Sequence, residues 1–177
     1  HYTDESVEIF PHMAEEPGTA VSVSGEAFLA RQEELTSVAA SGKTIVINGL
    51  EPGTYDIAGT EVKVKACGMR ALHFVSRKTG HPLVEGFTPY DFRLWYDTEK
   101  DRITPLLRRT FTADGMTPIL TSGNSLTASA WGQKLYPAFA CAEMKCGNGK
   151  IILNEVDLDS HLANPVARIF KNRLMRY

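Results

Sequence analysis

The cysteines and histidines are the residues of this chain best suited to covalent or metal chemistry. Cys67 stands in the turn-like sequence KACGM, where a thiol could act as a nucleophile if a histidine served as its base. The candidate bases are His73, His81 and His161. The preceding sequence EVKVK alternates charged and apolar residues, unlike the apolar strand that leads into an enzyme's nucleophile turn. A packed or surface thiol is therefore the favoured interpretation of Cys67.

Two further groups of residues could carry chemistry, but each can also be explained by a structural role. Cys141 and Cys146 flank a predicted hairpin and could face each other or bind a metal with a histidine. Metal sites usually contain tighter local pairs such as CxxC, so we predict free structural cysteines, no metal and no cofactor. Asp157, Asp159 and His161 alternate and could share one face of a strand end, although His161 could instead help to cap the last helix.

Carboxylates and a histidine also occur in the long segment 77–110. His81 precedes a proline, where a turn histidine bonded to the backbone is the simpler interpretation than a base. A glycosidase needs two carboxylates at a fixed separation, which sequence does not show. A solvated acidic loop is thus favoured over an active site; its acids are Glu85, Asp91, Asp97, Glu99 and Asp101.

The same segment carries five aromatic residues that could contact a partner or a sugar. They are Phe87, Tyr90, Phe92, Trp95 and Tyr96. Aromatic anchors are typical of interface cores, and long ordered loops often carry function. Packing or an interface is favoured over stacking on sugar rings.

Length and composition bound the class of protein. The 177 residues suit one globular domain, and the net charge of −2 gives no reason to expect nucleic acid or an anionic membrane as partner. No apolar run reaches membrane-spanning length, and three cysteines without a CxxC pair favour a reduced, cytoplasmic setting. The chain begins at His1 without a signal-peptide pattern, so we expect a fragment of a longer protein in which residues 1–18 form a linker.

A strand-helix-strand unit is predicted between residues 19 and 53. An apolar strand over 20–24 precedes an amphipathic helix over 26–40 and a β-branched strand over 43–48. Such a unit implies a parallel pair with a crossover, and chemistry in open α/β sheets gathers beyond the carboxyl ends of the strands. The turns there are Ser24–Glu26 and Asn48–Glu51. Neither offers a cysteine or a serine with an obvious base.

The remaining elements complete an α/β prediction for residues 19–177. The pattern predicts strands over 61–65, 71–76, 116–121, 138–144 and 150–156, one helical turn over 91–96, and a helix over 165–175 that begins after Asn164. The turn between the last two strands is typical of a hairpin. We therefore predict a three-layer flavodoxin-like sandwich, with a mostly parallel sheet, an antiparallel edge hairpin and a C-terminal helix.

Two blocks carry a resemblance to a known family. They are GHPLVEGFTPYDFRLWYD, residues 80–97, and the tail CGNGKIILNEVDLDSHLANPVARIFKNRLMRY, residues 146–177. Together they resemble the C-terminal region of bacterial glycoside hydrolase family 2 proteins, the β-galactosidase-like group. In such proteins a domain similar to class I glutamine amidotransferases can follow the catalytic barrel, and residues 19–177 resemble that domain.

The resemblance implies a non-catalytic accessory domain. The amidotransferase family places its cysteine at a turn that corresponds to residues 47–51 here, where the sequence reads INGLE. No catalytic residue can be carried over, and the hydrolase glutamates belong to a different domain. The implied partners are the other domains of the parent enzyme, a second copy of the chain, or a carbohydrate. Two alternatives stay open: an amidotransferase-like or sugar-processing enzyme using Cys67, and a carbohydrate-binding module using Trp95 and Tyr96.

Overall fold

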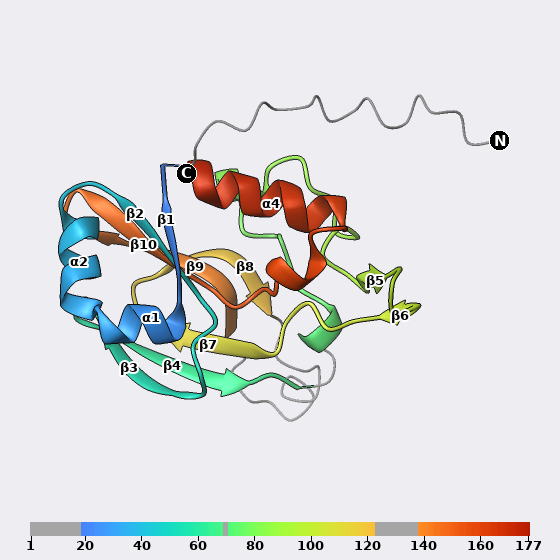
Figure 1. Cartoon of the computed structure of the whole chain (residues 1–177), viewed down its shortest axis with the longest axis horizontal. Helices are drawn as coiled ribbons and strands as arrows, with labels where there is room; N and C mark the ends of the chain where they lie inside the picture. Colours follow the sequence, from blue (N-terminus) through green and yellow to red (C-terminus); the bar gives the residue numbers. More distant parts are fainter. Residues whose placement is uncertain (1–18, 69–70, 123–137) are drawn as a thin grey trace.

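Eight strands form one mixed sheet in the computed structural model, which describes residues 19–68, 71–122 and 138–177. The order is β1-β2-β10-β9-β7-β4-β3, with β8 also paired to β9 (Figure 1). The strands are β1 (Val21–Ser24), β2 (Thr44–Asn48), β3 (Gly53–Ile57), β4 (Thr60–Ala66), β7 (Arg109–Ala113), β8 (Thr117–Ser122), β9 (Ala138–Cys146) and β10 (Gly149–Asn154). The predicted linker, residues 1–18, lies outside the described residues.

The strand-helix-strand prediction is confirmed. β1 and β2 pair in parallel, with two consecutive helices, α1 (Gly25–Ala30) and α2 (Gln32–Ala40), between them. The expected single helix is interrupted at Arg31, whose backbone leaves the helical region at φ −130°. Ser24 caps α1 by accepting a hydrogen bond from the Ala27 N–H. Buried Phe28, Leu35 and Ala39 then fix the helical face that meets the sheet.

The predicted hairpin of β9 and β10 is also confirmed, but its place at the edge is wrong. β10 pairs in parallel with β2 and antiparallel with β9, so the hairpin lies in the middle of the sheet. Both strands are mostly buried, as a central position requires. Gly149 allows the hairpin to meet α2, because a Cβ there would lie 2.3 Å from the Ala39 carbonyl oxygen.

The predicted three-layer flavodoxin-like sandwich is wrong. The chain is mostly β, and its mixed sheet curls, with three short α-helices among the described residues. The error arises between residues 51 and 113, where only strands over 61–65 and 71–76 and one helical turn were predicted, whereas two further strands, β3 and β7, occur. β3 and β4 form a tight hairpin in which Ala58 and Gly59 both have positive φ. Alanine is not a typical residue for that turn, so the hairpin carried no clear sequence signal.

Two hydrophobic cores lie on opposite faces of the parallel strands. One contains Phe28, Leu35 and Ile47 beneath α1 and α2. The other contains Val46 and Phe170 beneath α4 (Pro165–Arg176), the predicted C-terminal helix, which Asn164 caps through the Val166 N–H. Successive residues of β2 point into different cores because strand side chains alternate. None of the helices in the described part of the chain is long and apolar enough to cross a lipid bilayer.

The segment between β4 and β7 forms short elements that pack onto the second core. They are 3-10 helices at Ala71–His73 and Pro82–Val84 and the small sheet of β5 (Tyr96–Asp97) with β6 (Arg102–Ile103). The expected strand over 71–76 is reduced to isolated bridges at Phe74 and Ser76. The expected helical turn over 91–96 is replaced by a turn at 91–92, an isolated bridge at Arg93 and irregular backbone that leads into β5. A further 3-10 helix, Asp159–His161, precedes α4.

Candidate functional site

The carboxyl ends of the three parallel strands carry a hydrogen-bonded row of polar side chains. Asn48 of β2 and Asn154 of β10 are register partners. The Asn154 amide donates to Asn48 Oδ1 at 2.9 Å, and the Asn48 amide donates to Ser22 Oγ of β1 at 2.9 Å. Asn154 also donates to the Val156 carbonyl and accepts from the Val156 N–H. This polar row joins the three strands beneath α4.

The turn after β2 is closed by buried and hydrogen-bonded groups. Leu50 is fully buried, and its N–H donates to Glu155 Oε1 at 2.8 Å. The Gly49 N–H donates to the Asn154 carbonyl at 3.1 Å. The neighbouring turn presses against this one, because a Cβ on Gly25 would lie 2.4 Å from the Gly49 carbonyl oxygen. The N–H groups of Gly49 and Leu50 are therefore used within the protein.

Glu155 is the buried titratable group of this region. It follows β10 directly, and only 7% of the residue is exposed. Burial raises the pKa of its carboxyl from 4.5 to about 7, while the Leu50 hydrogen bond and Arg109 lower the pKa and Glu51 raises it. A carboxyl group with a pKa near neutrality can exchange a proton at physiological pH, which is a common property of functional sites.

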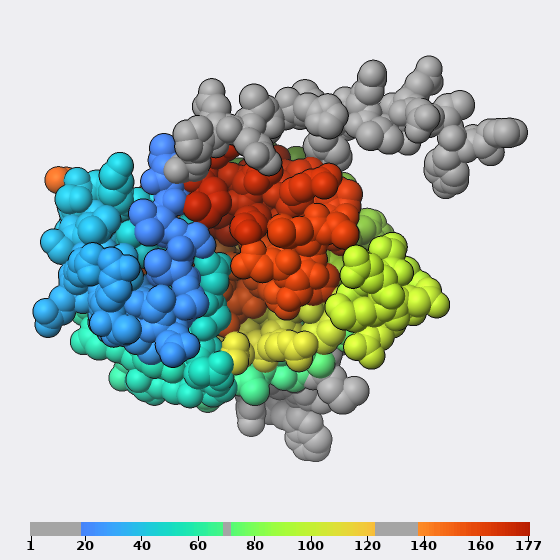
Figure 2. Space-filling view, in the orientation of Figure 1, coloured from blue at the N-terminus to red at the C-terminus, as the bar shows by residue number. Residues whose placement is uncertain are grey.

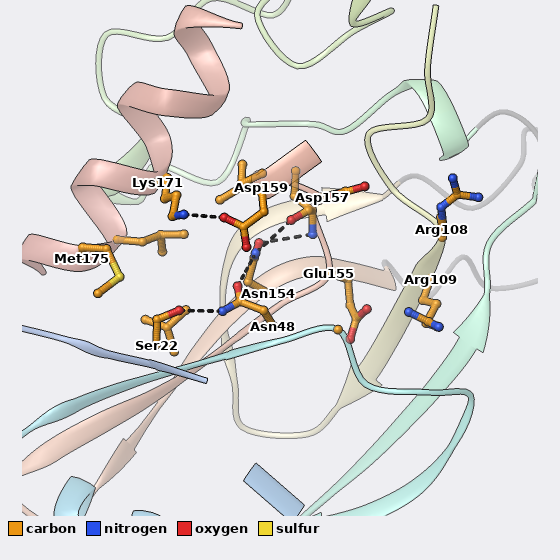
Figure 3. A pocket seen from close by; sticks show the side chains of 15 residues that line it. Ser22, Asn48, Arg108, Arg109, Asn154, Glu155, Asp157, Asp159, Lys171 and Met175 are labelled. Atoms are coloured by element: carbon orange, nitrogen blue, oxygen red, sulfur yellow. Dashed lines mark hydrogen bonds and ion pairs between the residues drawn. The ribbon is translucent and has the colours of Figure 1, made fainter. Parts of the chain in front are cut away.

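A cavity of about 240 Å³ opens above the polar row, between the parallel strands and α4. Figure 3 shows Asp159 facing Lys171 on the α4 side, Arg108 and Arg109 at the far end, and Glu155 beside Arg109. Lys171 forms an ion pair with Asp159, and Arg109 pairs with Glu51. The arrangement can bind a small polar molecule. The sequence predicted that chemistry would lie beyond the carboxyl ends of these strands. It did not identify the two asparagines or Glu155 as candidate site residues.

The aromatic residues of the long loop divide into two groups. Phe87, Phe92 and Trp95 are core residues, and the Trp95 indole N–H donates to the Asp91 carbonyl at 2.7 Å. Tyr90 and Tyr96 are exposed. Because Trp95 is buried, it presents no open ring face to a sugar. The hypothesis of a carbohydrate-binding module that uses Trp95 and Tyr96 is therefore weakened. A contact role for the two tyrosines stays a prediction.

The cysteines are separated by the fold. Cys141 and Cys146 both lie on β9, five positions apart, and therefore point to opposite faces of the sheet, where each joins a different core. They cannot face each other as the sequence had allowed. Cys67 is half-buried, and its thiol donates to the Leu107 carbonyl at 3.6 Å. Desolvation raises the pKa of this thiol, which opposes thiolate formation.

His81 and His161 are held by hydrogen bonds within the protein, whereas the buried Nδ1 of His73 has no hydrogen-bond partner among the described residues. His81 Nδ1 accepts from the Leu83 N–H, which agrees with the backbone-bonded turn histidine favoured from the sequence. His161 contacts the Asp157 carbonyl through Nδ1 and Thr104 through Nε2, so it points away from the cavity that Asp157 and Asp159 line. The three residues of this alternating pattern thus do not act together. Within the described residues no histidine is hydrogen-bonded to Cys67, and no group of three potential metal ligands occurs.

We expect Cys67 to react slowly with thiol probes. Its raised pKa leaves little thiolate at pH 7, so its alkylation by iodoacetamide should be at least several-fold slower than that of free cysteine. Mass spectrometry of the labelled peptide gives the rate for this residue. Fast alkylation at pH 7 would contradict this expectation and support Cys67 as a nucleophile. The Cys67→Ser variant is the control that gives the background rate of labelling.

The comparisons with known proteins add no relatives. No family model matches the chain, and neither a curated protein nor a solved structure matches it.

Proposed function

We propose that this chain is a non-catalytic accessory unit of a larger glycoside hydrolase, which it contacts through an exposed surface beside the β5–β6 hairpin. The assignment to a glycoside hydrolase, and the cytoplasmic setting, come from the sequence alone. The contact role is supported by the structure's exposed apolar residues. The closed turn at Leu50 supports the non-catalytic part, because the turn after β2 holds a buried leucine and no nucleophile.

The observation that carries the proposal is a group of exposed apolar side chains within one segment. We call Tyr90, Leu94, Tyr96 and Ile103 the hairpin patch; they are exposed by 75%, 54%, 50% and 44%. Tyr96 and Ile103 are register partners on β5 and β6. Figure 2 shows this segment, in yellow-green, projecting from the body of the protein. Exposed apolar groups of this kind are typical of protein–protein contact sites.

The hairpin patch is anchored to the core by its buried neighbours. Phe92 packs edge-on against Phe87 and Phe170 with ring centroids 5.0 and 5.5 Å apart. The Leu94 N–H donates to the His73 carbonyl at 2.9 Å and fixes the chain between the buried Phe92 and Trp95. A surface that is already ordered loses little conformational entropy on binding. The buried aromatic residues therefore support the contact by positioning the exposed ones.

A double substitution tests the contact. Leu94 has φ +47°, which asparagine tolerates well, so Leu94→Asn with Tyr90→Ser removes apolar surface without new strain. In the full-length polypeptide that contains this chain, we expect at least tenfold faster release of the unit by limited proteolysis. The isolated unit should keep its unfolding free energy within about 0.5 kcal/mol, as surface changes usually do.

The control is Leu29→Gln, which removes an exposed apolar side chain from α1, outside the hairpin patch. It should leave the proteolysis rate unchanged. Equal rates for the double variant and the control would refute the contact. Sedimentation velocity could instead show that the double variant loses self-association while domain docking is unchanged. In that case the partner would be a second copy of the chain and not the parent enzyme. A reading frame without a hydrolase domain would remove the glycoside hydrolase assignment.

A further inference from the structure

The cavity above the polar row has the dimensions and position of a small-ligand site. Its volume of about 240 Å³ lies below the range of roughly 300–1,000 Å³ typical of drug-sized ligands. It lies at the carboxyl ends of parallel strands, where ligands of open α/β sheets bind. Figure 2 shows the corresponding hollow between the blue β1–α1 region and the red α4 region. The site is distinct from the hairpin patch and independent of the glycoside hydrolase proposal.

The charges around the cavity favour a neutral ligand. Three cationic side chains and three acidic ones line it: Arg108, Arg109, Lys171, Glu155, Asp157 and Asp159. Lys171 and Asp159 are already paired, and so are Arg109 and Glu51. A phosphate or another anion would meet the acidic groups as well as the cations. It would also find no main-chain cradle, since Gly49 and Leu50 donate their N–H groups within the protein.

The available groups can both donate to and accept from a ligand. Within the described residues, Arg108 forms no ion pair, so its guanidinium is available as a donor. Asp157 accepts from the Ser160 N–H through Oδ1 at 3.2 Å, which leaves acceptor capacity on its carboxylate. The hydroxyl of Ser22, which accepts from Asn48, keeps its own proton to donate. Hydroxyl groups match this set because each of them donates and accepts.

The cavity wall also contains apolar surface. Val46 of β2 and Leu174 and Met175 of α4 lie beside the polar groups. A sugar ring has both C–H faces and hydroxyl edges, whereas an inorganic ion has no apolar face to bury. We infer that this cavity binds a neutral polyhydroxylated molecule of monosaccharide size, with Arg108 and Asp157 as its principal hydrogen-bonding residues.

Binding of single sugars provides the test. Saturation-transfer NMR and calorimetry with D-galactose, D-glucose and myo-inositol should detect at least one ligand with a Kd on the order of 1 mM, as expected for so small a molecule. Asp157→Asn keeps an acceptor for the Ser160 N–H but removes the charge, and Arg108→Gln removes the guanidinium. Each should weaken binding by about tenfold, the loss expected for one hydrogen bond to a charged group.

The matched control is Lys145→Gln, an exposed substitution on β9 outside the cavity lining. It should leave the Kd unchanged, and heteronuclear NMR spectra should show that all three variants are folded. Several results would overturn the inference: no binding of any of the three polyols at 50 times the expected Kd (about 50 mM), binding that neither cavity variant weakens, or tighter binding of inorganic phosphate or glycine than of every polyol. None of these results bears on the hairpin patch, whose test uses other residues.

Discussion

Replacing Phe92 with alanine is expected to lower the free energy of unfolding by about 3–5 kcal/mol, the usual cost of removing a buried phenylalanine. The side chain is fully buried, and its ring packs against Phe87, Trp95 and Phe170. Loss of the ring would leave a cavity between the long loop and α4. For a protein of this size the midpoint of thermal unfolding should fall by roughly 10 °C. Urea unfolding and calorimetry measure both quantities.

The matched control is Tyr96→Ala in the same loop. Tyr96 is half exposed, so its removal should change the unfolding free energy far less than the removal of Phe92 does. The two substitutions together distinguish aromatic residues that pack in the core from those that are exposed. The sequence alone had placed both kinds in one group. Equal effects of the two substitutions would show that the loop does not pack on the core as described.

The second large effect is a dependence of stability on pH that originates at Glu155. Its pKa is about 7 in the folded protein and near 4.5 when the group is unperturbed, so the folded state binds more protons between these values. The stabilisation by the protonated carboxyl is complete below pH 4.5 and is lost as pH rises through 7. The loss amounts to about 3 kcal/mol, at 1.36 kcal/mol per unit of pKa. Urea unfolding at several pH values between 5 and 8 measures it.

Glu155→Gln should remove most of this pH dependence. Glutamine does not titrate, and its side-chain oxygen can still accept from the Leu50 N–H, so the variant should be more stable than the parent at pH 8. The control, Glu33→Gln on the exposed face of α2, should leave the slope as it is in the parent. Parallel pH profiles for Glu155→Gln and the parent would contradict the assignment of this titration to Glu155.

The elements that the sequence predicted correctly depend on contacts between near neighbours. The helix over 165–175 follows from Asn164 and Pro165 at its start and from apolar residues at helical spacing. The β9–β10 hairpin follows from a glycine-rich turn between two apolar runs. The parallel pair of β1 and β2 follows from a short crossover whose helical face is apolar. Each of these signals lies within about 30 residues of sequence.

The sheet as a whole could not be predicted in the same way. β10 lies beside β2 although about 100 residues separate them, and the strands that extend the sheet, β3 and β7, are short and partly exposed. Their position depends on pairing with β4, whose alternating pattern was recognised while its partners were not. Strand preference is set by cross-strand neighbours and burial, which a single segment does not reveal. The flavodoxin-like prediction failed for this reason.

The candidate site shows the same division between local and long-range information. The sequence alone determined that polar turns follow the parallel strands and that the turn after the second strand contains Gly-Leu instead of a nucleophile. Only the tertiary structure brought Glu155 against Leu50, 105 positions away, and placed the acids of the segment after β10 beside Lys171 of α4. Burial by residues distant in sequence raises the pKa of Glu155, so neither this pKa nor the cavity could be read from any one segment.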